Sequence, residues 1–443
     1  MITQRSVPYL TNSEIYFERL RPLGNAVFLD SGRPNCPWGR FDIIAAAPVE
    51  TLSMNADQPA FDALQDLYNR YQNPQAEQAD LPFQGGIIGH FAYDLGRSVE
   101  AMPVKAVDFA SLPDMQVGMY LWGLVVDHHK EQAFLVADHR VSKEQLDQIE
   151  LQLTRATTSP NTDFQLDKAF SANITEAEYQ RKLEQIDNYI HAGDCYQVNF
   201  AQRFNSSYQG DSWEAYKKLR THAPTPYSAY IDLGEQQILS LSPEQFLETK
   251  DGVVTTKPIK GTRPRSSDTA EDQRLKQELS DSLKDRAENL MIVDLMRNDL
   301  SKVCQHNSVK VPKLFNIESY ANVHHKVSTV TGNLSSDYSP ISLLKHCFPG
   351  GSITGAPKIR AMEIIEELEP HRRSIYCGSI GYISLCGRMD TSITIRTLLC
   401  ENDQIFCWAG GGIVADSVSS MEYQETFDKV NNLLQCLEAT IPN

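Results

Sequence analysis

Three β-rich segments near the C-terminus follow one another with only short connections between them: SIGYISL, DTSITIRTLLC and QIFCWAGGG. Connections this short cannot hold a crossover helix, so the segments are expected to pair as antiparallel strands. Along the middle segment, Ser392, Thr394 and Arg396 alternate onto one polar face. Because an arginine can hold a carboxylate with two parallel hydrogen bonds, this face predicts a binding site for an anion.

The composition limits the partners of the chain. Its 443 residues carry a net charge of −16, whereas proteins that bind nucleic acid or anionic membranes need a basic face. Its nine cysteines are dispersed, which fits reduced thiols better than disulfides or a zinc site. The N-terminal segment lacks the pattern of a signal peptide, and the longest apolar run, residues 121–126, is too short to cross a bilayer. We therefore expect a cytoplasmic protein that binds neither nucleic acid nor membranes.

The segment TTKPIKGTRPR, residues 255–265, concentrates positive charge around one lysine. Residues 253–256 predict a strand, and Pro258 with Gly261 should break it into a turn that projects Lys260. The neighbouring cations Lys257, Arg263 and Arg265 are expected to lower the pKa of Lys260, which would make its amine a nucleophile. On charge pattern alone, the alternative is a solvated basic turn at the surface.

A glutamate lies at the end of a predicted strand close to this lysine. Residues 236–246 read as a strand that ends at Ser242 and Pro243, which places Glu244 just after the end of the strand. If burial keeps its carboxyl protonated, Glu244 could serve as a general acid; otherwise it is a surface glutamate. A hairpin with the strand 253–256 would bring Glu244 and Lys260 to the same end of a sheet.

Two predicted helices present acidic pairs. A single long helix over residues 269–304, with Leu283 and Leu290 on its apolar side, carries Asp285 and Glu288 three residues apart. The last helix, residues 417–437, has three charged residues at helical spacing: Glu422, Glu425 and Lys429. Such carboxylates are usually solvated, but two helices together could hold a hard cation such as Mg²⁺.

A polar segment divides the chain. Residues 154–163 contain few large apolar side chains and are broken by Pro160, so we expect a boundary between residues 1–160 and residues 161–443. Beyond it, Thr175 and Glu178 form a capping-box pattern that starts a helix over residues 175–192. Before it, residues 26–47 predict two strands joined by a turn that either lines a pocket for a flat ligand or forms an ordinary hairpin.

Two glycine-rich loops lie between the acidic helices. In PGGSITGAPK, Pro357 falls at or near the first turn of a helix, and AGGGIVADS leads into the last helix. Backbone N–H groups of such loops can cradle a carboxylate. Neither loop has the spacing of a dinucleotide fingerprint or a P-loop, so a nucleotide ligand is not indicated.

Taken in order, the motifs of residues 170–430 resemble those of one family, the chorismate-using enzymes. This family includes anthranilate synthase component I, aminodeoxychorismate synthase component I, and isochorismate and salicylate synthases. The matching motifs are SLSPE, PIKGT, KDRAENLMIVDLMRNDL, VHHKVS, GGSITGAPK, ITIRT, AGGGIVADS and YQETFDK. The resemblance implies an α/β sandwich of two large antiparallel-rich β-sheets with helices on the outside.

Two positions indicate a branch of the family. Anthranilate synthases typically have alanine where this chain has Lys260, and the lysine that activates water in isochorismate and salicylate synthases aligns with Gln197. The chain therefore resembles the aminodeoxychorismate synthases, which convert chorismate and ammonia to 4-amino-4-deoxychorismate for p-aminobenzoate and folate synthesis. The alternatives are an anthranilate synthase component I, or a catalytically silent scaffold that binds tryptophan.

The resemblance also implies roles for individual residues. Lys260 would attack C2 of chorismate while Glu244 protonates the departing C4 hydroxyl. Glu288 and Glu425 would hold Mg²⁺, with Asp285 and Glu422 acting through water. The remaining substrate contacts would come from seven residues: His325, Ser352, Tyr382, Arg396, Gly411, Gly412 and Lys429.

The same resemblance implies a partner subunit and a bound tryptophan molecule. The sequence contains no nucleophile elbow of a glutaminase, so a separate glutamine amidotransferase subunit would supply ammonia. A tryptophan molecule would occupy a pocket formed by Ser31, Trp38, Gly39, Arg40, Phe41, Pro226, Tyr227 and Ser228. The motif FLDS differs from the LLES type of feedback-inhibited anthranilate synthases, which leaves open whether tryptophan regulates the enzyme or only fills space.

Overall fold

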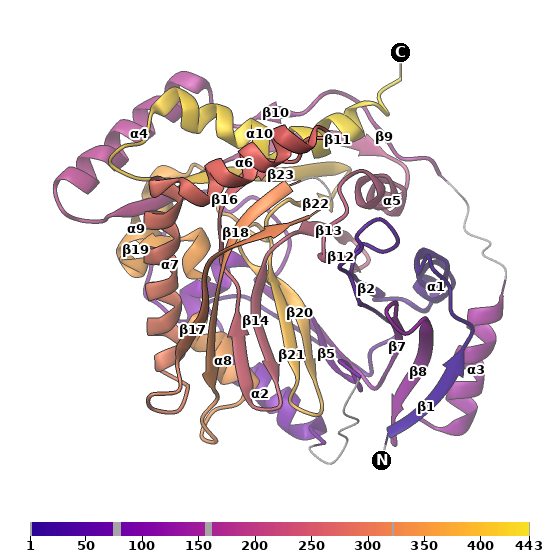
Figure 1. The fold of residues 1–443 in the computed structure, drawn as a ribbon. Helices are drawn as coiled ribbons and strands as arrows, with labels where there is room; N and C mark the ends of the chain where they lie inside the picture. The colour runs from indigo at the N-terminus through magenta and orange to yellow at the C-terminus, as the bar shows by residue number, and fades with distance from the viewer. Residues whose placement is uncertain (1, 74–80, 156–161, 321–322, 443) are drawn as a thin grey trace.

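Two large, mainly antiparallel β-sheets and a set of covering helices make up the fold (Figure 1). The computed structural model describes residues 2–73, 81–155, 162–320 and 323–442. This architecture confirms the expected sandwich. None of the helices in the described part of the chain is long and apolar enough to cross a membrane.

The first sheet has 13 strands, and its main path runs β1-β8-β7-β3-β2-β12-β13-β22-β23-β11-β10. The short strands β9 and β19 pair with β11 beside this path. Its strands are β1 Ile2–Val7, β2 Val27–Asp30, β3 Phe41–Ala45, β7 Trp122–Asp127, β8 Gln132–Asp138, β9 Gln165–Leu166, β10 Ser171–Ala172, β11 Gln197–Gln209, β12 Tyr227–Asp232, β13 Gln236–Ser242, β19 Gly355–Ala356, β22 Thr397–Glu401 and β23 Gln404–Ile413.

The second sheet has 10 strands in the order β16-β18-β15-β14-β21-β20-β5-β6-β4, and β17 also pairs with β18. Its strands are β4 Glu50–Met54, β5 Gly86–Phe91, β6 Met115–Tyr120, β14 Gln245–Lys250, β15 Val253–Thr256, β16 Ile259–Pro264, β17 Lys310–Ser319, β18 Val323–Asn333, β20 Ser379–Ser384 and β21 Met389–Ile393.

Helices cover the outer faces of both sheets, with α1, α5 and α10 against the first and α2 and α7 against the second (Figure 1). Helix α4 starts at the capping box of Thr175 and Glu178, as the sequence predicts. The helices are α1 Glu14–Leu20, α2 Ala60–Tyr71, α3 Lys143–Thr154, α4 Glu176–His191, α5 Ser212–His222, α6 Thr269–Asp281, α7 Leu283–Ser301, α8 Pro340–Cys347, α9 Lys358–Leu368 and α10 Ser419–Glu438.

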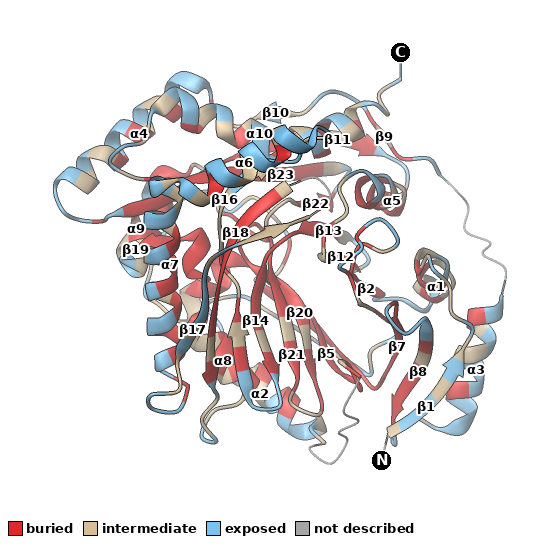
Figure 2. Ribbon diagram, viewed as in Figure 1, coloured by how far each residue is buried: buried red, intermediate tan, exposed pale blue. Residues whose placement is uncertain are grey.

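Alternating side chains build a separate core on each face of the first sheet. Val27 and Ile43 point into the core between the sheets, whereas Phe28 and Ile44 point into a second core under the outer helices. This is the two-residue period of strands that are buried on both faces. The buried strands and exposed helix surfaces are distinct in Figure 2.

Residues on both sides of the predicted boundary share the two sheets. Strand β2 pairs with β12, and β5 pairs with β20, so each sheet contains strands from residues 1–160 and from residues 161–443. Most of the polar segment itself, residues 156–161, lies outside the described residues. The two regions are therefore joined through continuous sheets.

The chain passes directly from one sheet to the other at two places, one of which lies inside the segment 390–400, predicted as a single strand. Residues 116–126 form β6 and β7 in different sheets, and residues 390–400 form β21 and β22 in different sheets. The second crossing ends at Arg396, whose φ of 52° is left-handed and stops the extended backbone. Period-two alternation continues through such a crossing, so the pattern alone does not reveal it.

The predicted long helix is wrong, because it is divided in two at Ser282. This residue leaves the helical conformation with ψ of 113°, and its hydroxyl accepts a hydrogen bond from the backbone N–H of Asp285. A serine that caps a helix in this way starts a new helix. The change of direction also leaves Leu283 and Leu290 exposed rather than on an apolar face.

Candidate active site

Two crossings between the sheets lie side by side and carry two of the predicted site residues. Glu244 lies between β13 and β14, and Arg396 lies between β21 and β22. The N–H of Ile393 donates to the carbonyl of Glu244 at 3.0 Å, and the N–H of Leu241 donates to the carbonyl of Arg396 at 3.0 Å. These bonds hold both residues at the wall of one cavity of about 800 Å³.

Most of the predicted site residues line this cavity together. Its wall contains eleven of them: Glu244, Lys260, Asp285, Glu288, His325, Ser352, Arg396, Gly412, Glu422, Glu425 and Lys429. Gly411 lies beside the wall, since a Cβ atom on it would be 3.1 Å from Glu422 Oε2. Segments more than 180 residues apart in sequence thus meet at one site.

Lys260 lies within strand β16 rather than in the predicted turn. The pairing of β16 with β18 is irregular between Ile259 and Thr262, and Gly261 has a left-handed φ of 87°. A Cβ atom on Gly261 would come within 2.9 Å of Asp285 Cγ, so only glycine fits here. The bulge directs the Lys260 ammonium to the carbonyl of Ser352, at 3.1 Å.

Burial, rather than neighbouring cations on the same segment, lowers the pKa of Lys260. Glu288 and Glu244 act against this shift. The predicted role of Arg263 and Arg265 is corrected, because Arg263 pairs with Glu278 at 2.7 Å and Arg265 pairs with Asp272 at 2.8 Å. Their charges are neutralised close to their own positions.

The predicted hairpin between residues 236–246 and residues 253–256 is wrong, because β13 pairs with β12 and β22 of the first sheet. The hairpin beside Glu244 starts instead with β14, in the second sheet. Strands β14 and β15 pair antiparallel, so Glu244 precedes the hairpin and Lys260 follows it. Burial raises the pKa of Glu244, while a hydrogen bond from the Ser352 hydroxyl and the charge of Lys260 partly oppose the rise. Ser352 therefore contacts both groups, the acid through its hydroxyl and the amine through its carbonyl.

Carboxylates from α7 and α10 form an acidic cluster on another wall. Burial raises the pKa of Glu288, and Asp285 and Glu425 act in the same direction. The Lys284 ammonium lies 3.7 Å from Glu422 Oε1 and 4.0 Å from Glu288 Oε1, which places a positive group between the two helices. The cluster therefore favours a cation among its oxygens.

The donor set fits a hard divalent cation completed by other ligands. Within the described ranges, no group of three or more acidic, histidine or cysteine side chains is arranged to hold a metal ion. Glu288 and Glu425 each place a carboxylate on the cavity wall, and Gly411 leaves space beside Glu425 that a Cβ atom would fill. Mg²⁺ commonly uses one or two protein carboxylates together with water and substrate oxygens.

Cationic and neutral donors also line the catalytic cavity. Over the part of the chain that the structure describes, the Arg396 guanidinium makes no ion pair, and burial lowers its pKa. Burial and the charge of Arg396 also lower the pKa of His325 to about 3, so this imidazole is neutral, and its Nδ1 lies 2.8 Å from Thr262 Oγ1. Lys429 pairs with Glu425 at 2.6 Å, which lowers the pKa of that carboxyl despite its burial. Arg396 is thus available to an anionic ligand.

Tyr382 is the exception among the predicted substrate contacts. It lies in the middle of β20, where it lines a different, smaller cavity. The tyrosine in the catalytic cavity is Tyr376, in the connection before β20. This connection is held beside Arg396 by a bond from Cys377 N–H to the Thr394 carbonyl at 2.8 Å. The sequence reading missed Tyr376 because it lies outside any periodic segment, and Asn199 of β11 was missed for lack of a motif.

The smaller cavity, of about 230 Å³, brings the predicted tryptophan contacts together. Its wall contains all eight: Ser31, Trp38, Gly39, Arg40, Phe41, Pro226, Tyr227 and Ser228. Asp390 lies on the same wall, and burial together with the nearby charge of Glu248 raises its pKa to about 7. The predicted turn between β2 and β3 therefore lines a cavity with aromatic side chains and two aspartates, Asp30 and Asp390.

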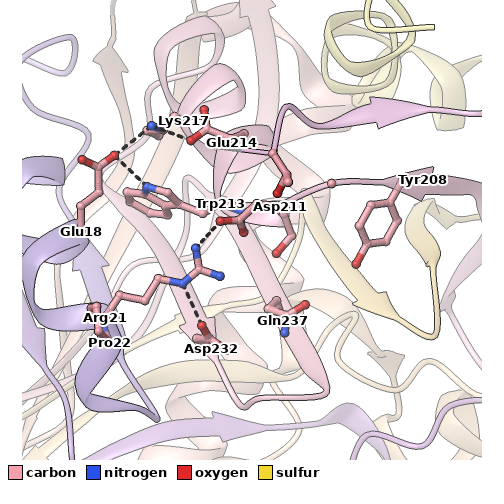
Figure 3. Close-up of a pocket in the computed structure, with 13 residues that line it drawn as sticks. Glu18, Arg21, Pro22, Tyr208, Asp211, Trp213, Glu214, Lys217, Asp232 and Gln237 are labelled. Carbon is pink, nitrogen blue, oxygen red and sulfur yellow. Dashed lines mark hydrogen bonds and ion pairs between the residues drawn. The ribbon is translucent and has the colours of Figure 1, made fainter. Parts of the chain in front are cut away.

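A third hollow, at the surface beside α1 and α5, contains no predicted site residue (Figure 3). Arg21 pairs with Asp211 at 2.6 Å and with Asp232 at 2.9 Å. Lys217 pairs with Glu18 and with Glu214, each at 2.9 Å. Every charged side chain on its described wall has a partner on that wall.

Comparison with known proteins identifies the class. The model of the chorismate binding enzyme family matches residues 25–435. The chain therefore belongs to this family.

Its relatives include aminodeoxychorismate synthases and anthranilate synthases. The chain is 48% identical to aminodeoxychorismate synthase component 1 of Escherichia coli (strain K12), with 96% of each chain covered. It is 40% identical to anthranilate synthase component 1 of Thermus thermophilus, with 85% of this chain and 83% of the relative covered. A crystal structure of anthranilate synthase component I from Streptococcus pneumoniae TIGR4 superposes with a TM-score of 0.81 at 33% identity and covers 90% of this chain and 92% of the other.

Proposed function

We propose that the chain catalyses the amination of chorismate at C4, as the first component of an aminodeoxychorismate synthase. The observation that carries this proposal is the arrangement around Ser352, which bonds Lys260 through its carbonyl and Glu244 through its hydroxyl. A buried amine with a lowered pKa and a buried acid with a raised pKa are the pair that a covalent substitution requires. The 48% identity to an aminodeoxychorismate synthase component 1 supports the same branch.

The reaction proceeds in two substitutions. The neutral Lys260 amine forms a bond to C2, the ring double bond shifts, and the C4–O bond breaks as Glu244 gives its proton to the departing hydroxyl, which leaves as water. Ammonia then forms a bond to C4 and the C2–N bond breaks, so that Lys260 leaves as a free amine. The proton lost by ammonia restores the Glu244 acid. General acid catalysis of this kind contributes about 10²–10⁴-fold.

Residues on the other walls of the catalytic cavity bind the substrate and the cation. Arg396 and Lys429 hold one chorismate carboxylate, and Gly411 and Gly412 leave room for it beside the last helix. Glu288 and Glu425 hold Mg²⁺, with Asp285 and Glu422 behind them. The bound Mg²⁺ supplies positive charge for the ring carboxylate.

Ammonia comes from a second subunit. The printed name of the relatives, component 1, supports the existence of a partner component. We assign this partner as a glutamine amidotransferase, and we assign the complex to p-aminobenzoate and folate synthesis in the cytoplasm.

The cavity around Tyr382 binds tryptophan or a similar aromatic amine. Its aromatic wall fits a flat ring, and Asp390 offers a carboxylate for an ammonium group. Arg40, also on this wall, pairs with Asp127 at 2.9 Å, which positions the β3 side of the cavity.

One assay tests the proposal against its alternatives. Purified chain receives chorismate, Mg²⁺ and an ammonium salt at alkaline pH, and the product is identified by mass and NMR. An amine at C4 with the enolpyruvyl group retained supports the proposal. Anthranilate would instead identify an anthranilate synthase, and unchanged chorismate would identify a scaffold without activity.

A further inference from the structure

The catalytic cavity adjoins another cavity, of about 290 Å³, which is distinct from the cavity around Tyr382. The two share a common wall at the anion-binding end, formed by Pro243, Val323, His325, Arg396, Asp428 and Lys429. This 290 Å³ cavity, here called the side cavity, extends from the shared wall between the turn after β2, the end of α5 and the middle of α10. It is therefore a separate approach to the catalytic residues.

The catalytic cavity and the side cavity differ in the charge of the side chains that line them. The outer part of the catalytic cavity carries charged side chains, among them Arg263, Lys284 and Glu288. By contrast, the described residues that line only the side cavity include no charged side chain. They include Pro37, Trp38, Ala223, Pro224, Asn432 and Leu433.

The wall of the side cavity is held in place by buried bonds. The N–H of Gly32 donates to Asp30 at 2.7 Å, and the buried Arg220 guanidinium donates to both oxygens of Asp30, at 2.6 and 3.0 Å. Arg33 donates to the Gly39 carbonyl at 2.8 Å across the turn. These bonds fix the turn that carries Trp38, which is 59% exposed.

We propose that the side cavity is the entry passage for ammonia, whereas chorismate and its cation enter through the charged opening; this inference rests on the proposed function. A dianion in an uncharged passage loses hydration without gaining a partner, which is costly. Neutral ammonia has no such cost, and the described residues that line only the side cavity offer it no acidic group before the shared wall, where Asp428 lies. The passage ends at Arg396 and Lys429, next to the substrate.

The test uses a substitution at the exposed residue Asn432 to narrow the passage. Asn432 lies on the surface of α10, where its side-chain oxygen hydrogen-bonds with His222. Asn432→Trp places a ring in the passage, and Asn432→Ala removes the same hydrogen bond without adding bulk. Each variant is assembled with its glutamine amidotransferase subunit. Three rates are then measured: amination driven by glutamine, amination driven by an ammonium salt, and ammonia escape from glutamine.

The expected result separates the two nitrogen sources. Asn432→Trp lowers glutamine-driven amination by about 10-fold or more and raises ammonia escape, while ammonium-driven amination stays within about twofold, because bulk ammonia also enters by the charged opening. Asn432→Ala resembles wild type. Equal losses with both nitrogen sources, or no loss, overturn the passage. Ala223→Trp, which narrows the side cavity from the end of α5, is used if Asn432→Trp does not assemble. Failure of the wild type with ammonium salt would instead refute the proposed function.

Discussion

The surface hollow of Figure 3 and the catalytic cavity contain the same kinds of charged side chain but pair them differently. In the surface hollow, Arg21 bonds two aspartates and Lys217 bonds two glutamates. In the catalytic cavity, Arg396 has no ion pair with any described residue, and Glu244 and Lys260 have shifted pKa values.

The difference indicates where ligand binding energy is available. A charge that already has a partner gains little from a ligand, since binding would exchange one pair for another. A buried charge without a partner destabilises the free protein and gains a partner when an anion binds. The paired hollow therefore stabilises the fold, whereas the unpaired Arg396 of the catalytic cavity is available to a ligand.

Removal of the Lys260 amine should have the largest effect. Lys260→Ala deletes the proposed nucleophile, so the rate of chorismate amination should fall by about 10⁴-fold or more. The Lys217→Ala variant of the surface hollow provides the control and should keep full activity. Steady-state rates with chorismate and ammonium salt measure both. Substantial activity in Lys260→Ala would show that the amine does not react.

Loss of the Glu244 acid should be the next largest effect. Glu244→Gln keeps the shape of the side chain but cannot protonate the C4 hydroxyl, so kcat should fall by about 10²–10⁴-fold. Burial raises the pKa of Glu244, so its ionised form destabilises the folded state as the pH rises through that pKa. At pH 8 the variant should therefore be at least as stable as wild type in a thermal melt. A marked loss of stability would mean that Glu244 is a structural ion-pair partner.

A matched pair of arginine variants compares the two regions directly. Arg396→Met should raise the KM for chorismate by about 10- to 150-fold, the value of one or two hydrogen bonds to a charged group, without lowering stability. Arg21→Met should leave the KM unchanged and lower the free energy of unfolding by about 1–3 kcal/mol, because two partly buried aspartates lose their partner. Kinetics and urea unfolding measure both quantities. The reverse pattern would contradict the comparison.

The smallest effect concerns pH. The Ser352 hydroxyl stabilises the carboxylate form of Glu244 and so lowers its pKa. Ser352→Ala removes that bond but keeps the carbonyl near Lys260, so the pKa of Glu244 should rise. Glu244 must be protonated to act, so the basic limb of the kcat profile should move to higher pH. A basic limb that moves to lower pH would exclude Glu244 as the acid.

Local patterns predicted much of the fold and site. The capping box gave the start of α4. Glu244 and Lys260 do lie on either side of a hairpin, but its first strand is β14 rather than the predicted strand 236–246. The family resemblance predicted eleven site residues that line one cavity. These features depend on short-range geometry or on motifs that the sequence displays.

The remaining features depend on contacts across the fold. The crossing that ends at Arg396 follows from a left-handed residue that strand alternation does not reveal. The family resemblance assigned Tyr382 to the substrate, but the register of β20 points it into the smaller cavity. The pKa of Lys260 follows from burial, which the local charges of its own segment do not predict.

Intact-mass analysis of the protein with chorismate and Mg²⁺, but without ammonia, tests the central claim most directly. The account predicts an adduct with the mass of chorismate minus water, which peptide mapping places on Lys260. The adduct should be missing from Lys260→Ala and present in the surface-hollow variant Lys217→Ala. An adduct on another lysine such as Lys429, or its absence from wild type that aminates chorismate, would contradict the account.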